Sequence, residues 1–268
     1  MCIASSYSSS SYSITDMENI IDSFSELVHE RPREHLGDTD LSFDGRLDPA
    51  IRIHEDGGES GCGGKIWIAA QLLCEYILER TANSPAFVLD GNRPVKSVLE
   101  LGSGTGLVGI CVAMLDKQRL KQGIDVTITD IDQILPLMER NVELNHVQDH
   151  VRVKRLWWGE PLPLAEYFET SSGNLCERKS KIDLILLADC VYLEAAFKPL
   201  MDTLLELTNC SNPPVILMAS KKRRKADKKF FQMCAKHFKI TEITDYTNYE
   251  HYRKQRTKLS RFERVHER

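Results

Sequence analysis

Three glycines on alternate positions follow an apolar strand, and they restrict the fold more than any other feature of the sequence. Residues 95–101 have the character of a buried strand, and Gly102, Gly104 and Gly106 come directly after it. A helical apolar pattern then extends over 105–116. A glycine turn between a strand and a helix lets a ligand approach the backbone closely and presents the free N–H groups of the helix start. The pattern predicts a nucleotide-type site at the carboxyl end of a parallel strand.

The rest of the chain after residue 95 alternates strands with helices, which is typical of a doubly wound sheet. We predict an α/β fold with a seven-stranded, mostly parallel sheet. The expected strands are 95–101, 125–130, 151–154, 183–188, 214–219, 239–244 and about 260–266, and the expected helices are 105–116, 133–145, 195–208 and 225–237. We expect the polar segment 166–181 to be an exposed insertion.

The residues before this alternation are expected to form an extension of the main domain. Residues 1–13 are rich in serine and predict a disordered tail. Residues 14–94 contain a helical spacing over 14–30, an alternation over 41–55 that indicates short strands or a hairpin, and an amphipathic helix over 66–78. We predict that 14–94 packs on a core domain formed by 95–268.

Composition places limits on compartment and partners. The net charge of −4 does not favour general nucleic-acid binding, and no apolar run is long enough to span a bilayer. The eight cysteines include no Cys-x-x-Cys pair, and several lie within apolar runs, so we expect free thiols in a reducing compartment, with the cytoplasm as the default. We expect no metal site, no membrane contact and a monomer.

The glycine spacing decides between nucleotide classes. A dinucleotide fingerprint needs Gly-x-Gly-x-x-Gly, and Leu107 stands where its third glycine would be. The next strand, 125–130, ends at Asp130, whose carboxylate is placed to accept hydrogen bonds from two ribose hydroxyls. Asp132 is the competing acid, and we interpret it as the N-cap of the following helix.

A second acid ends another apolar strand. Asp189 follows the strand 183–188 and should lie beside the glycine loop, at the carboxyl edge of the sheet. The structural alternative is that Asp189 caps the helix near residue 195, but the gap to that helix makes a direct cap awkward.

These motifs together resemble a known family. Glu100-x-Gly-x-Gly-x-Gly106 resembles the first motif of class I S-adenosylmethionine-dependent methyltransferases, and Asp189-x-x-Tyr192 resembles a motif of the seven-β-strand protein-lysine methyltransferases, called methyltransferase family 16. The runs Gly61–Trp67 and Trp157–Gly159 match the same family, and the resemblance covers about 50–245. It implies a Rossmann-like fold, S-adenosylmethionine as the methyl donor and a protein lysine as the acceptor.

The resemblance also implies a role for each matched residue. Those expected to contact the methyl donor are Trp67 at its methionine end, Gly102, Ser103 and Gly104 through their backbone, Asp130 at the ribose, Trp158 at the adenine and Ala188 beside the methyl group. Asp189 and Tyr192 are expected to face the incoming amine as the catalytic pair. Trp67 has a structural alternative as a core residue, and we interpret Asn141 and Asn145 as structural, with Asn145 as a helix C-cap.

The substrate is less well defined by the sequence. Within the family the chain looks most like the fungal enzymes that methylate translation elongation factor one-alpha, while other members act on chaperones and AAA ATPases. The basic run Lys221–Lys229 is either a docking surface for an acidic protein or a solvated helix start. Methylation of another protein or of a small molecule, and a non-catalytic scaffold that binds S-adenosylmethionine, stay open as alternatives.

Overall fold

The computed structural model describes residues 37–56, 61–89, 93–169 and 178–265. The predicted serine-rich tail and the predicted helix over 14–30 lie outside the described residues. The boundary at residue 94 between an extension and a core domain stays a prediction. No helix in the described part of the chain is both long and apolar enough to cross a membrane.

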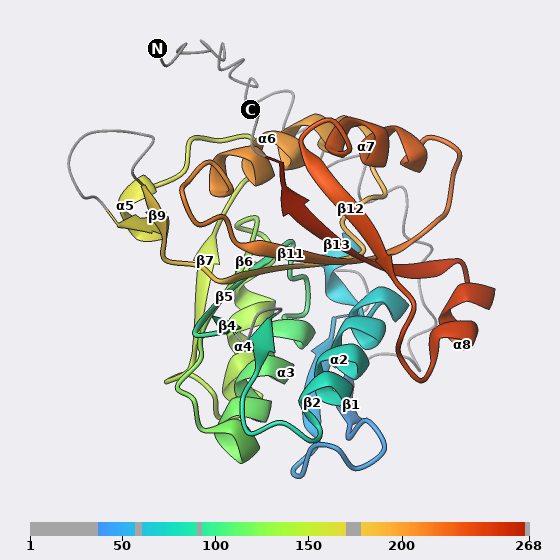
Figure 1. The fold of residues 1–268 in the computed structure, drawn as a ribbon. Helices are drawn as coiled ribbons and strands as arrows, with labels where there is room; N and C mark the ends of the chain where they lie inside the picture. The colour runs from blue at the N-terminus through green and yellow to red at the C-terminus, as the bar shows by residue number, and fades with distance from the viewer. Residues whose placement is uncertain (1–36, 57–60, 90–92, 170–177, 266–268) are drawn as a thin grey trace.

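A seven-stranded sheet forms the centre of the molecule, which confirms the predicted fold class (Figure 1). The spatial order is β12-β13-β11-β10-β5-β6-β7, and all neighbours are parallel except those of β13, which runs antiparallel to β11 and to β12. The strands are β5 Ser97–Leu101, β6 Asp125–Asp130, β7 Val151–Arg155, β10 Leu184–Ala188, β11 Val215–Lys221, β12 Phe238–Ile243 and β13 Thr257–Arg264. Each lies within a few residues of its predicted position.

Helices cover both faces of this sheet (Figure 1). One face carries α2 Ile68–Thr81, α3 Leu107–Leu115 and α4 Leu135–Leu144, and the other carries α6 Phe197–Leu207 and α7 Asp227–Cys234. The short helix α8, Tyr249–Lys254, lies between β12 and β13 in the sequence. The remaining elements are the short helix α5 Leu164–Tyr167 and the two-residue strands β3 Val88–Leu89, β4 Arg93–Pro94, β8 Phe168–Glu169 and β9 Lys179–Ser180.

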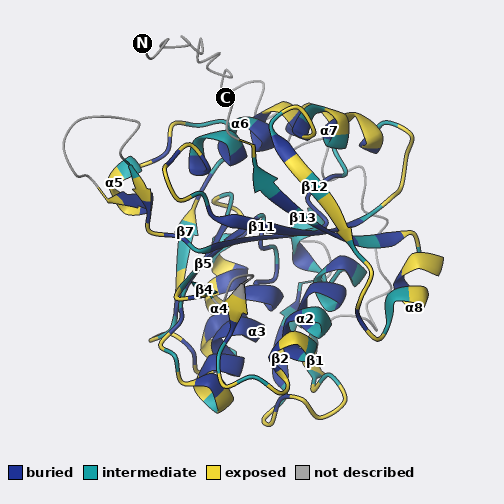
Figure 2. Ribbon diagram, in the orientation of Figure 1, coloured by how far each residue is buried: buried dark blue, intermediate teal, exposed yellow. Residues whose placement is uncertain are grey.

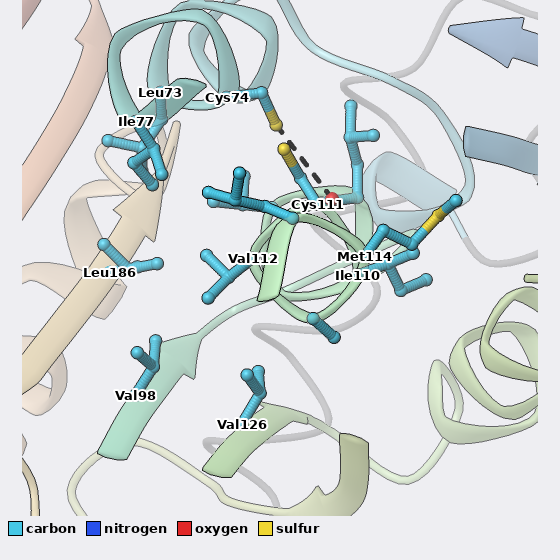
Figure 3. Packing of buried hydrophobic residues seen from close by; sticks show 14 of the residues in the cluster. Leu73, Cys74, Ile77, Val98, Ile110, Cys111, Val112, Met114, Val126 and Leu186 are labelled. Carbon is cyan, nitrogen blue, oxygen red and sulfur yellow. Dashed lines mark hydrogen bonds between the residues drawn. The ribbon is translucent and has the colours of Figure 1, made fainter. Parts of the chain in front are cut away.

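Two apolar clusters, one on each face of the sheet, hold these layers together (Figure 2). In the first cluster, α2 packs on α3, and both pack on the sheet; Figure 3 shows Ile77 and Val112 pointing toward Leu186 of β10. All nine residues of α3 are buried, so this helix has no solvent face. The glycine loop that precedes α3 is therefore fixed to a rigid element.

The hairpin predicted for 41–55 is present as β1 Gly37–Leu41 and β2 Ile51–Glu55, and α4 binds its free edge through two side chains. Asn141 accepts a hydrogen bond from the His54 N–H and donates to the His54 carbonyl. Asn145 does the same at Arg52. The two amides, one helical turn apart, thus replace a missing neighbouring strand, which confirms their structural interpretation. Asn145 also lies at the position where α4 ends, although His146 is the residue with a left-handed backbone.

Two local predictions need correction. The segment 166–181 is not simply an exposed loop, because Tyr167 and Phe168 at its start are buried and β8 pairs with β9 across it; 170–177 lie outside the described residues. The helix predicted over 225–237 starts two residues later and ends earlier, so most of the basic run precedes it.

Candidate active site

The glycine loop lies between β5 and α3 and is tied to β6 by three hydrogen bonds. The Ser103 N–H donates to the Thr129 carbonyl, the Thr129 N–H donates to the Ser103 hydroxyl, and the Gly104 N–H donates to the Asp130 carboxylate at 2.8 Å. The amide hydrogens of Ser103 and Gly104 are therefore already used within the protein. A ligand can meet these residues at their Cα and carbonyl atoms.

Glycine is required in this loop for conformation and for space. Gly102 and Gly104 both have positive φ angles, of 62° and 53°, where other residues are strained. A Cβ on Gly102 would lie 2.7 Å from the ring of Trp158, and one on Gly104 would lie 3.0 Å from the carbonyl oxygen of Gly63. The loop is thus covered by a tryptophan on one side and by the 3₁₀ turn Gly61–Gly64 on the other.

Glu100, the first residue of the glycine motif, binds the first turn of the helix that follows the loop. Its buried carboxyl accepts a hydrogen bond from the Gly109 N–H at 2.8 Å, which satisfies an amide in the first turn of α3. Burial raises the pKa of Glu100 to about 8, against the opposing hydrogen bonds from Gly109 and Ser103. In the sequence Glu100 is recognised only as part of the glycine motif, and the structure gives it a separate capping role.

The acids after β6 have different surroundings. Asp130 is half-buried, and its two oxygens accept the N–H groups of Gly104 and Ile131. Burial raises the pKa of Asp130 to about 6, so the carboxylate form dominates at neutral pH and still has lone pairs for two hydroxyls. Asp132 is exposed and accepts hydrogen bonds from Arg155 and from the Trp157 indole, so its predicted role as an N-cap is wrong.

The two adjacent tryptophans separate as expected. Trp158 packs over Gly102 and against the apolar cluster on the α6 side of the sheet. Trp157 points elsewhere, toward Asp132 and the guanidinium of Arg155. Trp158 is therefore the tryptophan that borders the glycine loop, as the family position predicts.

Asp189 lies at the end of β10 in an unusual conformation. Its φ angle is 62°, a left-handed value that an aspartate tolerates better than most residues, and its side chain is 3% exposed. Its N–H donates to the Ala219 carbonyl on β11. It does not cap α6, which begins at Phe197, so the structural alternative for Asp189 is wrong.

The partner of Asp189 is Arg223, a residue that sequence analysis placed only in a basic run. The two guanidinium Nη atoms of Arg223 bind the two carboxylate oxygens of Asp189, one of them at 2.7 Å. The Lys221 N–H donates to the same carboxylate at 3.2 Å. The signal available in the sequence was that this run follows β11 at the carboxyl edge that also carries Asp189.

Trp67 closes the site from the N-terminal side. It precedes α2, and its indole N–H donates to the Cys62 carbonyl at 2.8 Å. The Lys65 ammonium lies 4.6 Å and the Arg223 guanidinium 5.0 Å from the centroid of its ring. The half-buried Trp67 thus contacts the Asp189–Arg223 pair, which favours a site residue over a purely core residue.

Tyr192 and Ala188 belong to the same edge of the sheet. Tyr192 is half-buried, and burial raises the pKa of its phenol well above the ordinary value, with smaller contributions from Cys62, Asp130, Cys190 and Asp189. Tyr192 is therefore a neutral phenol near both acids. Ala188 is the last residue of β10, paired with Ala219.

Comparison with known proteins identifies the family. A model described as "Lysine methyltransferase" matches residues 46–237. The chain belongs to the lysine methyltransferase family. Protein-lysine N-methyltransferase EFM6 of Saccharomyces cerevisiae is 55% identical over 227 residues, covering 84% of this chain and 91% of the relative. Protein N-lysine methyltransferase METTL21A of Mus musculus is 38% identical over 195 residues, covering 72% and 76%. EEF1A lysine methyltransferase 3 of Mus musculus is 34% identical over 187 residues, covering 69% and 67%.

The resemblance drawn from the sequence motifs is thereby confirmed, and the chain is an S-adenosylmethionine-dependent protein-lysine N-methyltransferase. The residues at the site fit this cofactor. Gly102, which has a positive φ angle and no Cβ, lies against the ring of Trp158, and the half-buried carboxylate of Asp130 lies one strand away. The individual residue roles stay proposals.

Proposed function

We propose that this enzyme methylates a lysine of translation elongation factor one-alpha. The observation that carries the proposed site is the convergence of the glycine loop, Asp130 and Asp189 at the carboxyl ends of β5, β6 and β10, with Trp67 against the arginine that binds Asp189. For the substrate, the relative of Mus musculus that is 34% identical is named EEF1A lysine methyltransferase 3. The motif resemblance to fungal members of this kind supports the same choice.

In this proposal the residues at the glycine loop would hold the methyl donor. Gly102, Ser103 and Gly104 contact it through the backbone, Asp130 accepts its ribose hydroxyls, and the residues that border its other parts are Trp158 at the adenine, Trp67 at the methionine end and Ala188 beside the methyl group. When bound, S-adenosylmethionine supplies a methyl group whose bond to sulfur breaks, with the electron pair going to sulfur, as the lysine nitrogen forms its new bond to carbon.

The protein's part is to bring a neutral amine into line and to exclude water. Asp189 and Tyr192 lie where the amine must enter, and Tyr192 stays a neutral phenol that can accept or donate one hydrogen bond. The lysine loses its proton to solvent before the transfer, because an ammonium nitrogen has no lone pair. Trp67, held by Cys62, covers the site from the N-terminal side.

The substrate face is proposed to be acidic. The basic residues around Arg223 and the start of α7 that are exposed to solvent are Lys222, Arg224, Lys225, Lys228 and Lys229. They surround Arg223, whose guanidinium reaches into the site, so they rim the entrance for the target lysine. Rim charges of this kind chiefly raise the rate at which an oppositely charged partner associates.

Two further proposals concern where and in what form the enzyme works. We place it in the cytoplasm, which is supported by the free thiol state of every cysteine in the described residues. We propose that it acts as a monomer on its protein substrate.

The test is transfer of labelled methyl groups. The purified enzyme and its Asp189→Ala variant are each incubated with methyl-labelled S-adenosylmethionine, once with recombinant elongation factor one-alpha and once with a lysate that lacks the endogenous enzyme. We expect label on a lysine of the elongation factor with the unmodified enzyme only. Label on a chaperone, an AAA ATPase or another single protein would replace the proposed substrate. Label in small molecules alone, or nowhere, would overturn the proposed substrate class.

A further inference from the structure

The acid expected to meet the substrate amine already has a cation bound to it. Both oxygens of Asp189 are held by the guanidinium of Arg223, and the carboxylate also accepts the Lys221 N–H. The side chain of Asp189 is 3% exposed and that of Arg223 is 28% exposed. The arginine therefore lies between Asp189 and solvent, on the side of the pair that Trp67 covers.

This arrangement changes what Asp189 can do for a lysine. An isolated carboxylate beside the target nitrogen favours the ammonium form, which cannot accept a methyl group. The ordinary pKa of lysine is about 10.4, and each further unit of increase reduces the neutral fraction about tenfold at a pH below that value. A carboxylate that is already neutralised by a guanidinium does not have this effect, yet its oxygens can still accept hydrogen bonds.

We propose that Arg223 is a positioning residue for lysine methylation, which neutralises Asp189 so that the target amine enters the site without being held as an ammonium ion. The inference rests on the proposed function, because it requires a lysine as the acceptor. Arginine suits this role because its guanidinium stays protonated at every working pH and binds a carboxylate through two parallel hydrogen bonds.

Other groups face the pair from each neighbouring element, and they leave Arg223 as the cation bound directly to the carboxylate. They are Cys62 and Lys65 beside Trp67, Asp227 at the start of α7, and Cys190 and Tyr192 after β10. Farther from the pair, Asp130 acts on Cys190 and Tyr192, and Glu100 acts on Cys190. Removal of Arg223 therefore leaves the amine beside Asp189 without the guanidinium that binds both carboxylate oxygens.

The experiment compares Arg223→Gln, Arg223→Met and Arg223→Lys with the unmodified enzyme, on recombinant elongation factor one-alpha or on the protein that the lysate assay labels. Kinetics are measured from pH 6.5 to 9.5. Binding of the unmethylated substrate is measured separately in the presence of S-adenosylhomocysteine. Arg80→Gln is the matched control, since Arg80 also pairs with an aspartate, Asp245, and lies over a tyrosine ring, but at the far end of α2.

For both neutral variants we expect the acid limb of the kcat profile to move up by about one pH unit or more, with kcat at pH 7.5 reduced about tenfold. KM and the substrate Kd should fall, because the unpaired Asp189 attracts the ammonium form. Arg223→Lys should restore most of the profile, and Arg80→Gln should leave it unchanged. The Met variant retains apolar packing on Trp67, so it reports on charge if the Gln variant does not fold.

A loss of kcat together with a higher KM and an unshifted profile would show that Arg223 is only structural and would overturn the inference. So would a higher kcat in the neutral variants, which would make Arg223 a competitor of the substrate. These outcomes differ from failure of the proposed function, in which the unmodified enzyme itself labels no protein and the inference is lost with it.

Discussion

Replacing Glu100 by glutamine should make the protein more stable, and the gain should grow with pH. The carboxyl of Glu100 is 1% exposed, and its pKa is raised from the ordinary value of 4.5 to about 8 by burial. The folded protein therefore binds a proton that the unfolded chain releases throughout this interval. Stability falls as pH rises through it, because the unfolded state binds fewer protons than the native state.

The size of the effect follows from the shift. A difference between 4.5 and about 8 corresponds to about 5 kcal/mol when the penalty is complete, at 1.36 kcal/mol per unit. Glu100→Gln has no charge to bury, and the amide oxygen can still accept the Gly109 N–H that the carboxyl accepts at 2.8 Å. The difference in unfolding free energy between the two proteins should thus be small near pH 4.5, increase up to about pH 8 and stay level above it.

Urea denaturation at intervals between pH 5 and pH 9 measures this difference directly. Glu143→Gln, on the exposed surface of α4, removes the same formal charge and controls for net charge. Curves for Glu100→Gln and the unmodified protein that stay parallel across the interval would refute the reasoning, since they would mean that Glu100 is ionised in the fold without cost. A difference that grows toward low pH would reverse the sign and refute it equally.

Three other changes test separate parts of the structure. Asp130→Asn should weaken binding of S-adenosylhomocysteine by about 10- to 100-fold in calorimetry, because charge-assisted hydrogen bonds are lost, whereas the exposed Asp132→Asn should change it by less than about threefold. Binding to the unmodified protein should weaken below about pH 6, where Asp130 gains a proton. Equal effects of both variants would contradict the ribose assignment. Asp189→Ala should reduce kcat by about 100-fold or more while that affinity is kept, and a matching loss of affinity would argue against its role toward the amine. Asn141→Ala should lower the unfolding free energy by about 3–5 kcal/mol, because one buried and two half-buried backbone groups lose their partner, and a loss as small as that of the exposed Asn209→Ala would contradict the bridging role.

The sequence predicted the strands well because a buried parallel strand has a distinctive composition. The run 184–188 consists of apolar residues followed by an acid, and it forms the centre of the sheet between β5 and β11. Helix ends were predicted less well. The helix expected from residue 225 begins at Asp227, since the Asp227 carboxylate first binds the N–H groups of Arg223 and Arg224 and so fixes a turn before the helix.

The part of the site that sequence patterns missed depends on contacts between distant segments. Arg223 and Asp189 are 34 positions apart, and no local spacing pairs one arginine of a basic run with one acid on another strand. The wrong N-cap prediction for Asp132 has the same origin, because Arg155 and Trp157 reach Asp132 from the neighbouring strand and the loop after it. Motifs identify which residue types gather at an edge, and packing decides which of them become partners.

The three acids on neighbouring strands show how packing assigns charge. Glu100 lies within the core with one backbone donor, so desolvation dominates and the carboxyl tends to keep its proton. Asp130, at the edge of the sheet, accepts two backbone N–H groups, and its pKa is raised less, to about 6. It is therefore ionised at neutral pH, as its proposed role as an acceptor of hydroxyl hydrogen bonds requires. Asp189 is as deeply buried as a core residue but is paired with the guanidinium of Arg223, and the ion pair presents no net charge to its neighbours. A neutral support, an anionic acceptor and a compensated pair thus arise from the same residue chemistry at β5, β6 and β10. In the mechanism that we propose, a lysine nitrogen that has to lose its proton meets the compensated pair.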